Sequence, residues 1–176
     1  QAWKDALGFA PDIYGYHFDA FGGGWKMYIP LATVLQDEIK WARDFGVTNW
    51  KTEYYGGHPD KKLPRDTWGI MLRRWPGWAA TKLMWNPDLD LGALRKDFCD
   101  HVYGKGGADV AEYFRLLDAA WQGEGHISYY NNAPAAISDG FVRNPELVAK
   151  IDALFETAAA KAAGDARALG EIATEK

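Results

Sequence analysis

The sequence predicts an α/β fold in which a strand–helix–strand unit is followed by a series of helices. Two segments near the N-terminus, 12–18 and 47–55, are rich in strand-forming residues. Between them, apolar residues at helical spacing run from Val34 to Phe45, and Gly46 stands where a helix C-cap belongs. Strand, helix and strand in this order predict a parallel βαβ unit.

Glycines bound both predicted strands. Segment 12–18 ends at Asp19, and the glycine run 22–24 then interrupts regular structure. Segment 47–55 ends at the glycine pair 56–57, and a polar loop follows. Both strands therefore lead into loops at their carboxyl ends.

Helices are predicted for most of the remaining chain. Pro76 interrupts a tryptophan-rich stretch that ends at Trp85, so we expect a short helix up to about Trp75 and a second one starting at Pro76. Asp90 is placed to cap the next helix. The predicted inner faces of the helices from Asp90 onward are Leu91, Leu94, Phe98 and Val102, then Val110, Tyr113, Phe114, Leu117 and Trp121.

The last helix has the clearest start signal. Asn144 is followed by Pro145 and Glu146, the residue types favoured at an N-cap and in a first helical turn. An apolar stripe continues from Leu147 to Ala158. Beyond Thr157 the sequence is rich in alanine and predicts no closing cap.

Two parallel strands alone do not bury both faces of a sheet or satisfy its edges. We therefore expect further strands upstream, and predict the C-terminal βα units of a (β/α)8 barrel in 1–86 followed by a mostly helical extension in 87–176. The chain opens without Met and without a charged-then-apolar leader, so we interpret it as a processed or excised fragment. The upstream barrel portion would come from the same protein or from another chain.

Composition excludes several classes of protein. Of the 176 residues 48% are hydrophobic and 25% are charged, which is typical of a globular chain and not of a disordered one. No apolar run approaches the ~20 residues of a membrane span. The formal net charge is −4 and no basic block is present, which disfavours nucleic acid as a partner. The single cysteine, Cys99, is interpreted as a small core residue.

Carboxylates and aromatic residues follow the two predicted strands. Asp19 lies just past the first strand and Glu53 near the end of the second, where parallel barrels carry their functional side chains. Carboxylates bind sugar hydroxyls or act as acid, base or nucleophile, and aromatic faces stack on pyranose rings. We predict Glu53 and Asp19 as catalytic residues, with a set of substrate-binding residues around them: His17, Trp25, Trp50, Tyr54, Tyr55 and His58.

Other interpretations of these residues stay open. A carboxylate at a strand end can contact a ligand or serve only as a structural hydrogen-bond acceptor. His17 and His58 fit no compact ligand spacing, so neither a metal nor a cofactor is predicted. The triple glycine lacks the spacing of a dinucleotide-binding loop.

One stretch resembles a known bacterial family. Residues 78–90 read WAATKLMWNPDLD, followed by DFC at 97–99 and YG at 103–104. This run resembles the domain-of-unknown-function family 4838, whose members look like barrel glycoside hydrolases, and the resemblance covers about residues 44 to 121. A weaker likeness exists to the α-glucuronidases of glycoside hydrolase family 67. Pro76 and Val102 depart from the family pattern.

The resemblance implies the last one or two βα units of a barrel and the helical extension after it. From the carboxylates at the strand ends and the aromatic residues around them, we predict a carbohydrate-active protein that is secreted or periplasmic. The hypothesis is a glycoside hydrolase acting on a bacterial, plant or algal polysaccharide or oligosaccharide, with carbohydrate as its partner. The alternative is a non-catalytic carbohydrate-binding or scaffolding module. A third interpretation is a helical interaction module without a ligand.

Overall fold

The computed structural model describes residues 2–15, 31–52, 74–123 and 144–176. The chain divides into two compact units, Gln1–Leu91 and Gly92–Lys176, and each is described by itself. The ranges 1–86 and 87–176 stay a prediction about folding domains.

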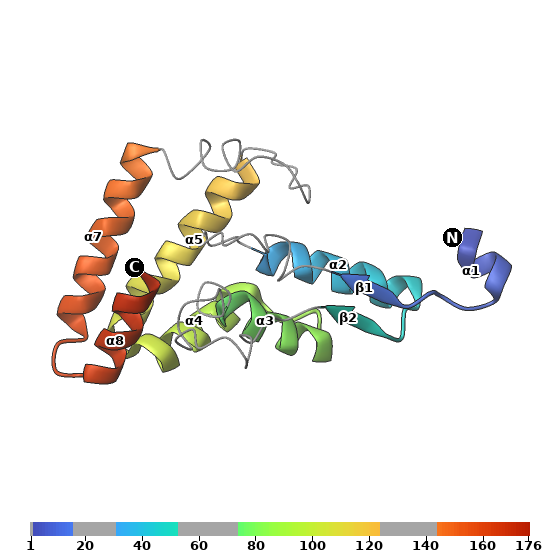
Figure 1. Cartoon of the computed structure of the whole chain (residues 1–176), viewed down its shortest axis with the longest axis horizontal. Helices are drawn as coiled ribbons and strands as arrows, with labels where there is room; N and C mark the ends of the chain where they lie inside the picture. The colour runs from blue at the N-terminus through green and yellow to red at the C-terminus, as the bar shows by residue number, and fades with distance from the viewer. Residues whose placement is uncertain (1, 16–30, 53–73, 124–143) are drawn as a thin grey trace, which may run out of the picture. The chain divides into compact units, whose positions relative to one another are not determined.

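The first unit combines a small parallel sheet with helices. Its elements in chain order are α1 (Ala2–Leu7), β1 (Ile13–Gly15), α2 (Ala32–Phe45), β2 (Trp50–Thr52) and α3 (Arg74–Trp85). The two strands run side by side, with Ile13 opposite Trp50 and Gly15 opposite Thr52 (Figure 1). α2 packs against α3, and Leu35 and Ala80 form a buried cluster between these two helices.

The end of α2 is closed by a Schellman motif, as the sequence predicts for Gly46. Gly46 adopts a left-handed φ of 87°, and its N–H donates to the carbonyl of Arg43. The N–H of Val47 donates to the carbonyl of Ala42. These two bonds satisfy carbonyls that have no partner within the helix.

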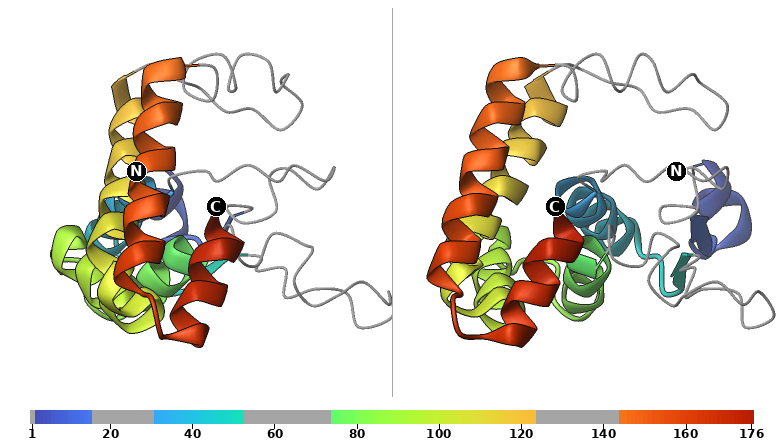
Figure 2. Two further views of the ribbon diagram at one scale, coloured as in Figure 1. Left: turned by 90° about the vertical axis from the view of Figure 1, so that its left-hand side faces the viewer. Right: turned by 60° about the vertical axis from the view of Figure 1, so that its left-hand side comes forward.

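The second unit is a helical bundle. Its elements are α4 (Leu91–Tyr103), η2 (Gly104–Gly106), α5 (Gly107–Gly123), α7 (Pro145–Lys161) and α8 (Ala166–Glu175). α7 runs antiparallel along α5, and α8 folds back against α7 (Figures 1 and 2). The predicted inner face of α5 is confirmed, because Val110, Phe114 and Leu117 are all buried.

The predicted fold class is wrong. The described residues are mostly helical and contain a single two-stranded sheet, in which each strand has three residues. They do not form the βα units of a (β/α)8 barrel. The predicted second strand was too long at its start because the N–H of Val47 belongs to the end of α2. Pairing begins only at Trp50, and the helices cover their apolar faces largely by packing on one another.

The boundary between α7 and α8 is not among the elements that the sequence predicts. Gly164 has a φ of 92°, and the Asp165 side chain caps α8 by accepting from the N–H of Ala168 at 2.9 Å. A glycine followed by an aspartate is a recognisable stop-and-start signal. The alanine-rich sequence on both sides concealed it.

Candidate functional site

The carboxyl ends of β1 and β2 lie next to each other. Gly15 and Thr52, the last residues of the two strands, are register partners in the parallel pair. In sequence, Asp19 follows Gly15 by four positions and Glu53 follows Thr52 directly. Most of the predicted site residues lie outside the described residues: His17, Asp19, Trp25, Glu53, Tyr54, Tyr55 and His58.

Trp50 is the predicted site residue that the structure describes. Its indole is half-buried and packs against the cluster of Leu35 and Ala80. The Nε1–H group donates a hydrogen bond of 3.0 Å to the Glu38 carboxylate on α2. These contacts orient Trp50 toward α2, and its role in substrate binding stays a prediction.

The neighbouring residue Lys51 pairs with Tyr14 across the sheet. The two are register partners, and the Lys51 ammonium lies 5.4 Å from the centre of the Tyr14 ring. Successive residues of a strand point to opposite faces, so this pair lies on the face opposite Trp50. The Tyr14 side chain is 46% exposed. A cation over an exposed aromatic ring is a feature that the sequence analysis did not single out.

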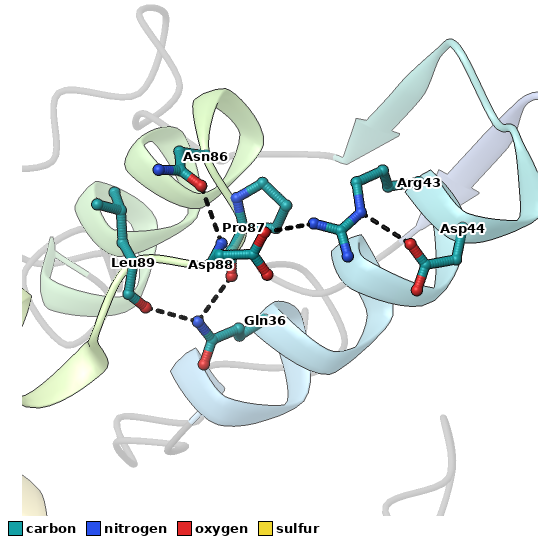
Figure 3. Close-up of polar contacts among 7 residues, drawn as sticks. All are labelled: Gln36, Arg43, Asp44, Asn86, Pro87, Asp88 and Leu89. Atoms are coloured by element: carbon teal, nitrogen blue, oxygen red, sulfur yellow. Dashed lines mark hydrogen bonds and ion pairs between the residues drawn. The ribbon is translucent and has the colours of Figure 1, made fainter.

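The WNPDLD part of the family-like run forms a turn that α2 holds in place. Figure 3 shows the Gln36 side-chain amide donating to the carbonyls of Pro87 and Leu89, both at 2.8 Å. The Asn86 side chain accepts from the N–H of Asp88 at 3.1 Å within the turn. Arg43, one helical heptad beyond Gln36, binds the Asp88 carboxylate at 2.7 Å.

The Arg43 guanidinium binds two carboxylates. It contacts Asp44 at 2.8 Å in addition to Asp88, and these hydrogen bonds raise the pKa of Arg43. All three side chains are largely exposed, so this ion pairing contributes little stability. The half-buried Gln36 amide is the stronger restraint on the turn, because it satisfies two backbone carbonyls at once.

Trp85, the residue just before this turn, is 92% exposed. Tryptophan side chains on a helix usually pack against the rest of the fold. That holds for Trp75, which is 1% exposed, and not for Trp85. The signal lies in the spacing: Trp85 is two residues past the buried Leu83, which places it about 200° around the helix. Trp68, also in the stretch, lies outside the described residues.

The second unit buries an ion pair between α4 and α5. Arg95 Nη2 lies 2.6 Å from Asp118 Oδ2, and both side chains are almost excluded from solvent. Burial raises the pKa of Asp118 to about 6, and the positive charge of Arg95 opposes this shift. Taking two charges out of water costs free energy that their attraction does not always repay.

Cys99 is fully buried in the same unit, which confirms its assignment to the core. Burial raises the pKa of the Cys99 thiol, and the Glu175 carboxylate adds to the shift. A cysteine in this state is mostly the unreactive thiol. Among the residues that the structure describes, no group of three or more His, Cys, Asp or Glu side chains is arranged to hold a metal ion.

None of the described helices is both long enough and apolar enough to cross a membrane. No curated protein and no solved structure gives a significant match to the chain. The sequence model of one protein family does match, over residues 12–115, and this range includes β1, β2, the clamped turn and about the first half of α5. The match covers more than half of the chain, which therefore belongs to the family described as Domain of unknown function (DUF4838).

Proposed function

We propose that the chain is part of a carbohydrate-active enzyme, a glycoside hydrolase that acts on a polysaccharide or oligosaccharide of bacterial, plant or algal origin. One observation carries the proposal: β1 and β2 are parallel and in register, so their carboxyl ends share one edge. The segments that leave this edge contain Asp19 and Glu53 together with several aromatic residues and histidines. Paired carboxylates with aromatic neighbours suit the hydrolysis of glycosidic bonds.

In the proposed reaction the two carboxylates divide the work of a glycoside hydrolase. One donates a proton to the departing glycosidic oxygen, and the other attacks the anomeric carbon or activates water. Glu53 and Asp19 supply these groups or bind sugar hydroxyls beside them. A hydrolase of polymeric substrate meets that substrate outside the cytoplasm, so we also propose a secreted or periplasmic location.

Replacing Glu53 by Gln in the full-length parent protein tests the proposal. The E53Q variant should release reducing sugar at least about tenfold more slowly than the native protein, equivalent to ~1.4 kcal/mol of lost transition-state stabilisation. Asp37→Asn is the matched control, because Asp37 is an exposed carboxylate on α2. D37N should keep the native rate, and an unchanged rate in E53Q would remove Glu53 from the mechanism.

The same protein preparation distinguishes a hydrolase from the alternative, a non-catalytic module. If the full-length protein hydrolyses no glycan while the chain binds oligosaccharide, the chain is a carbohydrate-binding or scaffolding module. In that case E53Q should weaken oligosaccharide binding, and neither protein should hydrolyse glycan. Absence of both binding and hydrolysis across neutral and acidic glycans would reject carbohydrate as the ligand.

A further inference from the structure

One side of α3 combines tryptophan with positive charge and carries no carboxylate. The helix reads RWPGWAATKLMW, and its charged residues are Arg74 and Lys82. Trp78, Lys82 and Trp85 are spaced by four and three residues, so they lie on one side of the helix. The adjoining side, with Trp75, Ala79 and Leu83, is buried.

Lys82 is held in place by the aromatic residues of its own helix. Its ammonium group lies 5.1 Å from the centre of the Trp78 ring. Trp78 in turn contacts the buried Trp75, with ring centres 6.2 Å apart. The cation is therefore positioned at the surface by a partly buried ring instead of sampling many rotamers.

Trp85 presents an indole that the described part of the chain leaves almost uncovered. Its side chain is 92% exposed. Burial of so large an apolar surface normally stabilises the folded state. Its backbone is fixed on both sides, because it ends α3 and precedes the turn that Gln36 clamps. Lys82 and Trp85 are about 4.5 Å apart along the helix axis, which places both within reach of one pyranose ring.

We propose that this side of α3 is a binding site for an acidic sugar unit. The C–H face of the pyranose stacks on the Trp85 indole, and the sugar carboxylate binds the Lys82 ammonium. Charge complementarity favours an acidic sugar over a neutral one, because the surface of α3 carries cations and no carboxylate. A pyranose gains from stacking on the flat exposed ring as well as from the Lys82 charge, whereas an acidic peptide would be bound through the charge alone. The exposed ring therefore favours a sugar.

The site on α3 uses none of the strand-end residues. It would hold an acidic glycan at the surface of the protein, whether or not that glycan is hydrolysed at the carboxyl ends of β1 and β2. Each proposal has its own variants and its own measurement, so an unchanged hydrolysis rate in E53Q and an unchanged affinity in W85A are distinguishable outcomes.

Calorimetric titration of the full chain with tetragalacturonate, maltotetraose and tetraglutamate tests the site. We expect binding of tetragalacturonate that weakens with added salt, and weaker binding of maltotetraose. Trp85→Ala should lower the association constant for tetragalacturonate about tenfold or more. Lys82→Gln should remove the preference for the acidic sugar and its salt dependence, while the stacking contribution stays.

Two variants serve as matched controls. Trp41→Ala removes another exposed tryptophan, which is 55% exposed and stacks on Phe45 of α2, and Lys40→Gln removes a lysine of the same helix. Both should bind tetragalacturonate as the native chain does. Because Trp85 is so exposed, W85A should keep the native circular dichroism spectrum.

Three results would overturn the proposal. One is no binding of tetragalacturonate by the native chain, and another is equal affinity in W85A. The third is equally tight binding of tetraglutamate, which would show that charge alone is recognised and that an acidic peptide is the better partner.

Discussion

The hydroxyl of Tyr103 donates a hydrogen bond of 2.9 Å to the carboxylate of Glu175, joining the last residue of α4 to the last residue of α8. Tyr103 is fully buried and Glu175 is 7% exposed. A carboxylate in such surroundings is costly without hydrogen-bond donors. The contact therefore fixes the C-terminal helix against the bundle at a specific position.

Tyr103→Phe should lower the free energy of unfolding of the second unit by about 1–3 kcal/mol, because a buried carboxylate loses a donor. Urea denaturation followed by circular dichroism measures the change. A double-mutant cycle with Glu175→Met, which removes the acceptor oxygens, isolates the pair, and the two changes together should cost less than the sum of the single ones. Strict additivity would contradict an energetic role for this hydrogen bond.

Sequence reasoning succeeded where the determining interactions are local. The Gly46 cap of α2, the start of α4 after Asp90, the start of α7 at Asn144 and the inner face of α5 depend on residues within a few positions of each other. It failed for Val34, which was placed on the inner stripe of α2 but is 46% exposed. Leu35, Ile39 and Ala42, which were predicted on the same stripe, are buried.

The contacts that shape the candidate sites are long-range and leave no local pattern. Gln36 is recognisable only as a polar residue in a helix, and its bonds to Pro87 and Leu89 depend on how α2 packs. The same holds for the pairing of Tyr103 with Glu175. The barrel prediction failed for a related reason. β propensity indicated a second strand from residue 47, but the N–H of Val47 is hydrogen-bonded at the end of α2, so the first residues of that segment do not pair in the sheet.

Gly106→Ala tests the close packing of η2 against α7 and α8. A Cβ at Gly106 would lie 2.6 Å from the carbonyl oxygen of Ala158 and 2.9 Å from Ile172 Cδ1. Because the first contact is with backbone, we expect a loss of about 1–3 kcal/mol in unfolding free energy. Gly170→Ala is the control: a Cβ there meets nothing within 4 Å. It should stabilise α8 by roughly 0.5–1 kcal/mol. Thermal melts of both variants compare their stabilities. Equal effects of G106A and G170A would contradict the close packing at Gly106.

Gln36→Ala tests the clamp on the 86–89 turn. Loss of two hydrogen bonds to backbone carbonyls should lower the stability of the first unit by about 1–2 kcal/mol. Arg43→Ala should have a smaller effect, because its partners Asp44 and Asp88 are exposed and screened by solvent. Urea titration followed by tryptophan fluorescence compares the two variants. A larger loss of stability in R43A than in Q36A would show that Arg43, and not Gln36, is the main restraint on the turn.

Asn144→Ala tests the start of α7. The Asn144 side chain accepts from the N–H groups of Glu146 and Leu147, both at 3.1 Å. Removing it should cost about 1 kcal/mol, and Asn144→Asp should restore most of that stability, because aspartate is an equally good N-cap. Amide hydrogen exchange in the first turn of α7 reports the change. Unchanged protection in N144A would show that Pro145 alone fixes this helix start.

Asp118→Asn tests the balance between burial and ion pairing at Arg95. Burial raises the pKa of Asp118 from 3.8 to about 6, so between these values the folded protein holds a proton that the unfolded chain has released. The free energy of unfolding therefore falls as the pH rises through this range, by about 2–3 kcal/mol from this group. Asn does not titrate, so the stability difference between the native chain and D118N should fall from about pH 4 to pH 7.

Glu112→Gln provides a control of opposite sign in the same unit. Hydrogen bonds from the Arg115 guanidinium lower the pKa of Glu112, so its contribution is present above the ordinary pKa and is lost as the pH falls. The difference between the native chain and E112Q should therefore rise with pH. Urea denaturation at a series of pH values measures both differences. If the difference for D118N also rises with pH, the attraction of Arg95 outweighs burial, and the ion pair between α4 and α5 stabilises the bundle instead of costing it stability.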